Sequence, residues 1–79
     1  KVTGVQTCAL PIFVLEDDRP ILFVECKNSD RDVDSSLRYL KARHPETEAW
    51  QVSAKGKADF VSVEGIRVAP ALTLLRRLV

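Results

Sequence analysis

Cysteine and histidine are scarce in this sequence, whose 79 residues include two cysteines and one histidine. Cys8 lies in an irregular N-terminal stretch and Cys26 in an apolar run, so we expect no disulfide framework and a reducing compartment. The sequence also lacks the run of roughly 20 apolar residues that a membrane-spanning helix requires. A formal net charge of +1 does not by itself require a nucleic-acid partner. These absences favour a cytoplasmic protein that does not cross a membrane.

The first twelve residues resemble no part of a folded domain. The stretch VTGVQTCALPI, residues 2–12, follows the period of neither a strand nor a helix. It also lacks the long apolar stretch and the small-residue cleavage site of a signal peptide. One reading frame of a common sequencing-library adapter encodes these eleven residues in order. We therefore interpret residues 1–12 as adapter-derived and base the functional argument on residues 13–79; a natural irregular arm is the alternative.

Apolar runs separated by turn signals predict two β-hairpins. IFVLE and PILFVECK flank the polar turn at residues 17–19. Further along, DFVSV and IRVA flank Glu64-Gly65, which is a weaker hairpin signal than Asn-Gly. Between the second and third of these runs the pattern changes from alternation to a longer period.

That longer period predicts a crossover helix. Its apolar residues recur at helical spacing: Val33, Leu37 and Leu40. Asp30 or Asp32 can cap the start, and Pro45 marks the end. EAWQVSA then reads as a third strand, so the strands at 20–27 and 48–53 are expected to lie parallel with right-handed connectivity.

The last segment, PALTLLRRLV, predicts a C-terminal helix. Proline suits the first turn, and the helix is apolar almost all round, so we expect it to be buried. The elements together predict an α/β fold: a truncated mixed sheet with a β-hairpin, a right-handed β-α-β crossover and a C-terminal helix. A chain of about 60 residues buries only about 60% of its unfolded surface, so we expect marginal stability.

The strongest chemical signal is FVECK, at the end of the second apolar run. Side chains alternate along a strand, so Glu25 and Lys27 share one face and Cys26 takes the other. Burying charges costs free energy unless they are paired or bind a ligand. One interpretation is a magnesium site with Glu25 and the backbone carbonyl of Cys26 as ligands and Lys27 stabilising charge. The other is a strand end that emerges into solvent as a Glu–Lys pair.

The stretch FVLEDDRPILFVECKNSD, followed by an amphipathic helix, resembles the core of PD-(D/E)xK nuclease-like domains. More closely, residues 13–79 resemble the C-terminal domain, of unknown function, of prokaryotic AAA-type ATPases. In that family an aliphatic strand ends in Glu-x-Lys, and the tail GIRVAPALTLLRRLV is also similar. The family has an aspartate before the phenylalanine that matches Phe13, whereas this chain has Ile12.

The resemblance implies magnesium-dependent phosphodiester cleavage in the intact protein. It makes Glu25 and Lys27 the catalytic residues, and Glu25 and the Cys26 carbonyl the metal ligands. Because the motif aspartate is missing, it also implies a half site that binds magnesium poorly and is inactive alone. ATP would bind in an absent ATPase domain, and DNA is the implied substrate. The alternative is a non-catalytic docking or dimerisation module in which Glu25 and Lys27 form a structural ion pair.

Two other signals are weaker. Acidic residues 30, 32 and 34 begin like a calcium loop, but Ser35 and Lys41 stand where glycine and glutamate are needed. We interpret these acids as residues of a helix start. His44 has no partner suited to catalysis and is expected at the surface.

Overall fold

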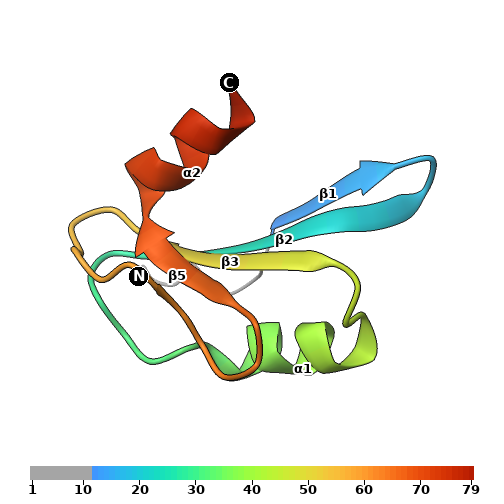
Figure 1. The fold of residues 1–79 in the computed structure, drawn as a ribbon, viewed down its shortest axis with the longest axis horizontal. Helices are drawn as coiled ribbons and strands as arrows, with labels where there is room; N and C mark the ends of the chain where they lie inside the picture. The colour runs from blue at the N-terminus through green and yellow to red at the C-terminus, as the bar shows by residue number, and fades with distance from the viewer. Residues whose placement is uncertain (1–11) are drawn as a thin grey trace, which may run out of the picture.

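The computed structural model describes residues 12–79 (Figure 1), so the segment interpreted as adapter-derived, residues 1–12, lies outside them except for its last residue. Their centre is a five-stranded sheet of order β1-β2-β3-β5-β4. The strands are β1 (Ile12–Glu16), β2 (Arg19–Lys27), β3 (Glu48–Ser53), β4 (Phe60–Val61) and β5 (Arg67–Pro70). The helices are α1 (Ser35–Arg43) and α2 (Ala71–Leu78). Parallel and antiparallel pairs occur together, so the predicted α/β fold with a mixed sheet and a C-terminal helix is confirmed.

The β1–β2 hairpin forms around two aspartates in the left-handed conformation. Asp17 and Asp18 have φ angles of 53° and 64°. Positive φ at both central positions is typical of the tight turn that matches strand twist, and aspartate tolerates it better than most residues. The strands run antiparallel with Phe13 opposite Phe23, and the two ring centroids lie 5.0 Å apart. The predicted hairpin is therefore confirmed, with β1 at the edge of the sheet.

Helix α1 connects β2 to β3, and these two strands pair in parallel, as predicted. The helix begins after Asp34, whose carboxylate accepts a hydrogen bond from the backbone N–H of Ser36 at 2.9 Å. The prediction that Asp30 or Asp32 caps the helix is therefore wrong. The Asp30 carboxylate instead accepts hydrogen bonds from the backbone N–H groups of residues 57 and 58. The chain stays non-helical up to residue 34 because its polar groups find partners in other segments.

The second predicted hairpin pairs β4 with β5 in antiparallel orientation. Gly65 in its turn has a φ of +87°, a conformation that favours glycine. β5 also pairs in parallel with β3 on its other side. Pro70 closes β5 and serves as the N-cap of α2, a position where its missing N–H costs little.

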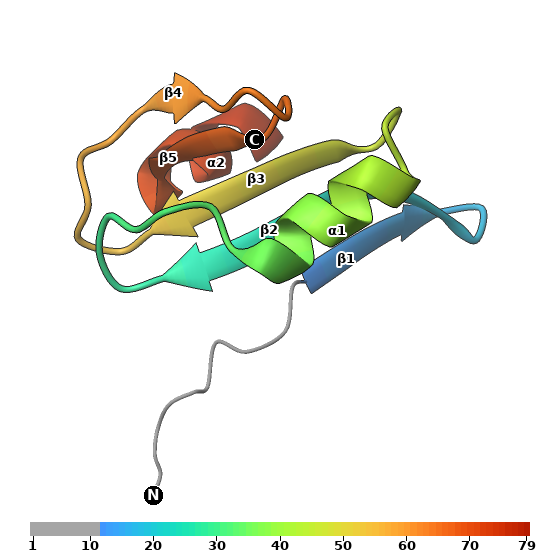
Figure 2. The ribbon, with the colours of Figure 1, turned by 90° about the horizontal axis from the view of Figure 1, so that it is seen from below.

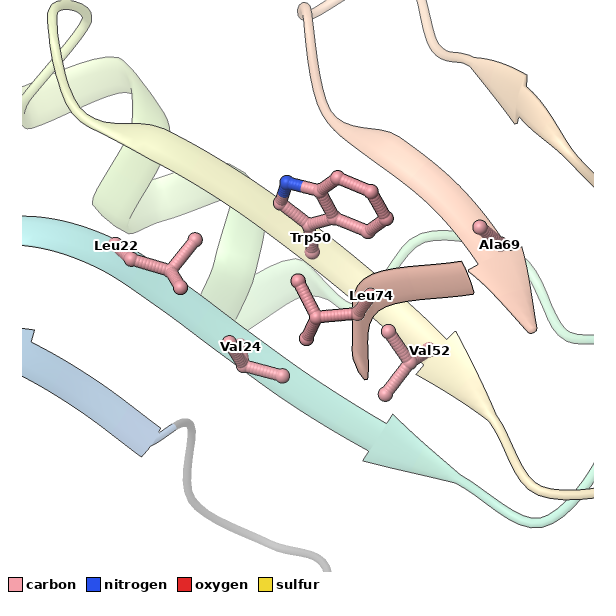
Figure 3. Close-up of a cluster of buried hydrophobic side chains, with 6 residues drawn as sticks. All are labelled: Leu22, Val24, Trp50, Val52, Ala69 and Leu74. Atoms are coloured by element: carbon pink, nitrogen blue, oxygen red, sulfur yellow. The ribbon is translucent and has the colours of Figure 1, made fainter. Parts of the chain in front are cut away.

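Each face of the sheet packs against one helix, with α1 below it and α2 above it in Figure 1. Figure 2, seen from below, shows α1 lying across β2. The core under α1 consists of Phe23, Val33, Leu37, Ala49, Ile66 and Val68. The core under α2 consists of Leu22, Val24, Trp50, Val52, Ala69 and Leu74 (Figure 3). Figure 3 shows the Leu74 side chain pointing toward the sheet between Trp50 and Val52.

The expectation that α2 is buried is wrong for most of its apolar residues. Leu74 is the buried residue of this helix, while Leu72, Leu75 and Leu78 are each more than half exposed. The helix touches the sheet along one side, and Leu75 and Leu78 line an apolar groove with side chains of β1 and β2. Neither α1 nor α2, the two helices of residues 12–79, is long and apolar enough to cross a membrane.

Candidate functional site

Glu25 and Lys27 lie at the carboxyl end of β2, on the sheet face that carries α1. Glu25 is 1% exposed and shares this face with Phe23, as the alternation predicted. β3 and β5 pair in parallel beside β2, so the three strands end at the same edge of the sheet. Open α/β sheets bind ligands outside the carboxyl ends of their parallel strands. The Glu-x-Lys pattern thus occupies the edge where such a sheet can hold a site.

The Lys27 ammonium bridges two carboxylates. Its Nζ lies 2.7 Å from Oδ2 of Asp34 and 3.4 Å from Oε2 of Glu25. The hydrogen bond between Lys27 and Asp34 raises the pKa of the lysine and lowers the pKa of the aspartate. Burial, and then the negative charge of Asp34, raises the pKa of Glu25 although Lys27 acts in the opposite direction. Lys27 therefore pairs mainly with Asp34, and its ammonium group compensates the negative charge of Glu25 less well.

Asp34 has a larger role than the helix start at which the sequence placed it. Its Oδ1 caps α1 by accepting a hydrogen bond from the backbone N–H of Ser36, while its Oδ2 accepts a hydrogen bond from Lys27. Sequence reasoning missed the second contact because it depends on how the loop folds back over the sheet. The usable signal was an acidic residue a short loop after the strand that ends in Lys27, at the start of the next helix.

A buried glutamine in β3 holds that loop in place. Gln51 is 2% exposed and stands opposite Glu25 in the β2–β3 register. Its Oε1 accepts the backbone N–H of Asp34 at 2.8 Å. Its Nε2 donates to the carbonyls of Arg31 and Asp32, at 3.2 Å and 3.0 Å. Sequence reasoning missed Gln51, although a single amide within the apolar run AWQVS was a usable signal.

Two buried oxygens here have no hydrogen-bond partner among residues 12–79: Oε1 of Glu25 and Oγ of Ser53. Ser53 is 7% exposed and stands opposite Lys27 in the register. Its side chain therefore lies on the same face as those of Glu25 and Lys27. Buried polar atoms are almost always paired, so unpaired ones point to a ligand, an ion or water as partner.

Gly56 lets the loop after β3 pack closely against the loop after β2. A Cβ atom at this position would lie 2.1 Å from Oδ1 of Asp30 and 2.3 Å from Oγ of Ser53. Residues 55–57 therefore form one side of the site. The N–H of Lys55 also donates to the carbonyl of Asn28 at 2.8 Å.

Two further residues considered from the sequence lie outside this cluster. Cys26 points to the opposite face, is exposed and lines the apolar groove beside α2. The role of its backbone carbonyl as a metal ligand stays a prediction. His44 ends α1 and is half-buried, with its ring centroid 5.7 Å from that of Phe23.

Position 12 is the main departure from the resemblance. Ile12 lies opposite Val24 in the β1–β2 register and lines the groove beside α2. It therefore occupies the face opposite to Glu25. An aspartate placed at position 12 in this register would point away from Glu25 and would not complete a site with it.

A magnesium ion fits this cluster in part. Magnesium prefers oxygen ligands, and the unpaired Oε1 of Glu25 is such an atom. However, residues 12–79 contain no group of three or more His, Cys, Asp or Glu residues able to hold a metal. The second nearby carboxylate, Asp34, is bound to Lys27.

Comparison with known proteins gives no relative: no family, no curated protein and no solved structure matches the chain significantly. Any assignment therefore rests on the cluster itself. It offers a buried carboxylate, an ammonium group in contact with two carboxylates, and the buried polar side chains of Gln51 and Ser53. Such an arrangement can hold a cation or stabilise charge on a substrate oxygen.

Proposed function

We propose that residues 13–79 are part of the C-terminal nuclease-like domain of a prokaryotic AAA-type ATPase, and that this part is inactive alone. The observation that carries the proposal is the buried Glu25 at the carboxyl end of a parallel strand. One of its oxygens has no hydrogen-bond partner among residues 12–79, and Lys27 follows it on the same face. The α/β fold around the pair supports the same proposal.

In the parent protein, Glu25, Cys26 and Lys27 would have different roles in cleavage. Glu25, with the Cys26 carbonyl, would hold magnesium, which supplies charge neutralisation at a phosphodiester. Lys27 would stabilise negative charge on a phosphate oxygen. To do so, it has to leave Asp34, to which it is bound at 2.7 Å. DNA as substrate, the ATPase domain as partner and a cytoplasmic location belong to the same proposal.

The proposal is tested by cleavage assays on two proteins. One is the 79-residue chain, and the other is a longer chain extended upstream of Phe13 with residues read from an independent DNA source. We expect no cleavage of single- or double-stranded DNA by the first, with magnesium or manganese. We expect cleavage by the second, and its loss in both Glu25→Ala and Lys27→Ala.

Glu46→Gln is the control, because Glu46 is exposed and lies at the other end of the crossover. The nuclease proposal would be ruled out if the extended protein cleaved no DNA. It would also be ruled out if the Glu25→Ala variant of the extended protein cleaved DNA equally well.

The second candidate is a docking or dimerisation module in which Glu25 and Lys27 form a structural ion pair. The close Lys27–Asp34 pair and the exposed leucines of α2 favour it. It predicts a dimer in light scattering that Leu75→Asp converts to a monomer and that Glu25→Gln leaves intact. A chain that is monomeric at high concentration would exclude the dimerisation form.

A further inference from the structure

We propose that Glu25 and Asp34 are the two carboxylates of a divalent-cation site. In this structure the Lys27 ammonium group occupies the position where the cation would bind. The inference rests on the proposed function in locating the metal at the end of β2. It differs in naming Asp34, in the loop before α1, as the second carboxylate instead of a residue at position 12. The cation class is magnesium or manganese, which carboxylate oxygens suit.

The first argument is that both carboxylates already surround one cationic nitrogen. Nζ of Lys27 lies within 3.4 Å of an oxygen of Glu25 and within 2.7 Å of an oxygen of Asp34. The ammonium group thus marks a position that both side chains reach. A metal at that position would use Oδ2 of Asp34 and leave Oδ1 to cap α1.

The second argument is the charge of the cluster. Two carboxylates face one ammonium group, so one negative charge remains uncompensated where Glu25 is 1% exposed. Isolated charge is costly in such surroundings. A divalent cation offsets both carboxylates, whereas Lys27 offsets one. In the native chain the metal must displace the ammonium group, so we expect binding to be weak.

The third argument comes from the two unpaired oxygens. Oε1 of Glu25 is buried beside Lys27 without a partner among residues 12–79. Oγ of Ser53 is also buried and has no hydrogen-bond partner in the described part of the chain, and Ser53 stands opposite Lys27 on the same face. A metal ion, with the waters it retains, supplies the partners that such oxygens need. Gln51 fixes the backbone of Asp34, so the second carboxylate is held in reach.

The experiment measures manganese binding by the full 79-residue chain. Paramagnetic broadening in the ¹H–¹⁵N spectrum locates the ion, and titration gives the apparent dissociation constant. We compare the native chain with Asp34→Asn, Lys27→Met and the matched control Asp32→Asn. The Asp32 side chain is exposed, and its loop contact to Gln51 uses the backbone carbonyl.

We expect broadening centred on residues 25–27 and 34 in the native chain, and the same in the control. Asp34→Asn should remove it. Lys27→Met should bind manganese about tenfold more tightly or better, because it removes a positive charge next to the ion. If Lys27→Met does not fold, the native chain and Asp34→Asn decide the question by themselves.

Broadening that persists in Asp34→Asn, or that centres on another acidic segment, overturns the inference. So does the absence of broadening at millimolar manganese in the native chain and, where that variant folds, in Lys27→Met. The test is independent of cleavage: the cation site can exist in a protein that cleaves no DNA. Conversely, cleavage by the extended chain with an unchanged rate in Asp34→Asn would retain the nuclease proposal and remove this one.

Discussion

At the scale of single residues, the carboxylate of Glu25 is the group whose surroundings determine the most chemistry. It is 1% exposed, and its partner Lys27 lies closer to Asp34 than to it. Burial therefore raises its pKa, while the hydrogen bond from Lys27 lowers the pKa of Asp34. The two carboxylates contribute to stability with opposite dependence on pH.

For Glu25 the raised pKa means that the folded state keeps the proton at a pH where the unfolded chain has lost it. The free energy of unfolding due to this group falls as the pH rises through the raised pKa. It is fully present below the ordinary value of 4.5. We expect Glu25→Gln to melt at a higher temperature than the native chain near pH 7 and at a similar temperature near pH 4. Thermal melts in the presence of a chelator measure both melting temperatures. The same difference between the two proteins at both pH values would contradict the prediction.

Asp34 has the opposite sign. Its pKa is lowered in the folded protein, so its contribution is present above the ordinary value of 3.8. This contribution is lost as the pH falls through the folded pKa. We expect Asp34→Asn to be less stable than the native chain at neutral pH, with a gap that closes in acid. A gap that widens below pH 4 in the same melts would contradict the assignment.

Gln51 is the residue whose loss should disturb the loop before α1. Leucine at this position leaves an N–H of Asp34 and carbonyls of Arg31 and Asp32 without their amide partner. Unpaired buried groups cost about 1–3 kcal/mol, so Gln51→Leu should lower the free energy of unfolding by about that amount. Urea titration measures it, with Glu46→Gln as an exposed control. A Gln51→Leu variant as stable as the control would show that water replaces the amide.

At the scale of elements, the site is formed where two loops meet above the ends of β2 and β3. Gly56 is the point of closest approach, and it faces Asp30 and Ser53. These loops contain no regular structure, so their mutual contact and the hydrogen bonds of Asp30 hold them.

Two glycine substitutions separate crowding from backbone strain. In Gly56→Ala the new methyl group overlaps Asp30 and Ser53, and overpacking of this kind costs about 1–3 kcal/mol. In Gly65→Ala the new methyl group would lie 3.6 Å from Cε of Lys41, an ordinary van der Waals contact, so the cost is that of a left-handed alanine, about 1–2 kcal/mol. We expect both to lower the urea midpoint. Only Gly56→Ala should shift the amide resonances of residues 30 and 53.

The elements themselves follow from local pattern, and their ends follow from long-range contacts. Alternation in the second apolar run predicted β2 and the shared face of Glu25 and Lys27. The helix start was predicted too early. Val33 continues the helical spacing of Leu37 and Leu40, but residues 30–32 form hydrogen bonds with other segments. A periodic pattern carries no information about such partners.

At the scale of the whole molecule, residues 12–79 place one helix on each face of the sheet, and many apolar side chains among these residues are exposed. The residues of β1 from Ile12 to Leu15 are exposed, and so are most leucines of α2. The stability of the sheet on the α2 side thus depends strongly on Leu74, the one buried residue of that helix.

Leu74→Ala and Leu75→Ala form a matched pair on one helix. Leu74 is 7% exposed and packs on β3, whereas Leu75 is 57% exposed. Truncating a buried leucine costs about 2–5 kcal/mol, so Leu74→Ala should be largely unfolded at room temperature or melt far lower. Leu75→Ala should change the melting temperature little. Equal effects would mean that the outer side of α2 is also covered in solution.

The sequence by itself determined the order of the elements, the two hairpins, the parallel crossover and the face that Glu25 and Lys27 share. These features depend on neighbouring residues: on alternation, on turn aspartates and glycines, and on apolar spacing along a helix. Tertiary structure alone decided which groups gather around Lys27. Asp34 is seven residues away and bonds in turn to Gln51, 17 residues further along the chain. It also decided that position 12 faces away from Glu25, because the register of β1 on β2 sets that direction.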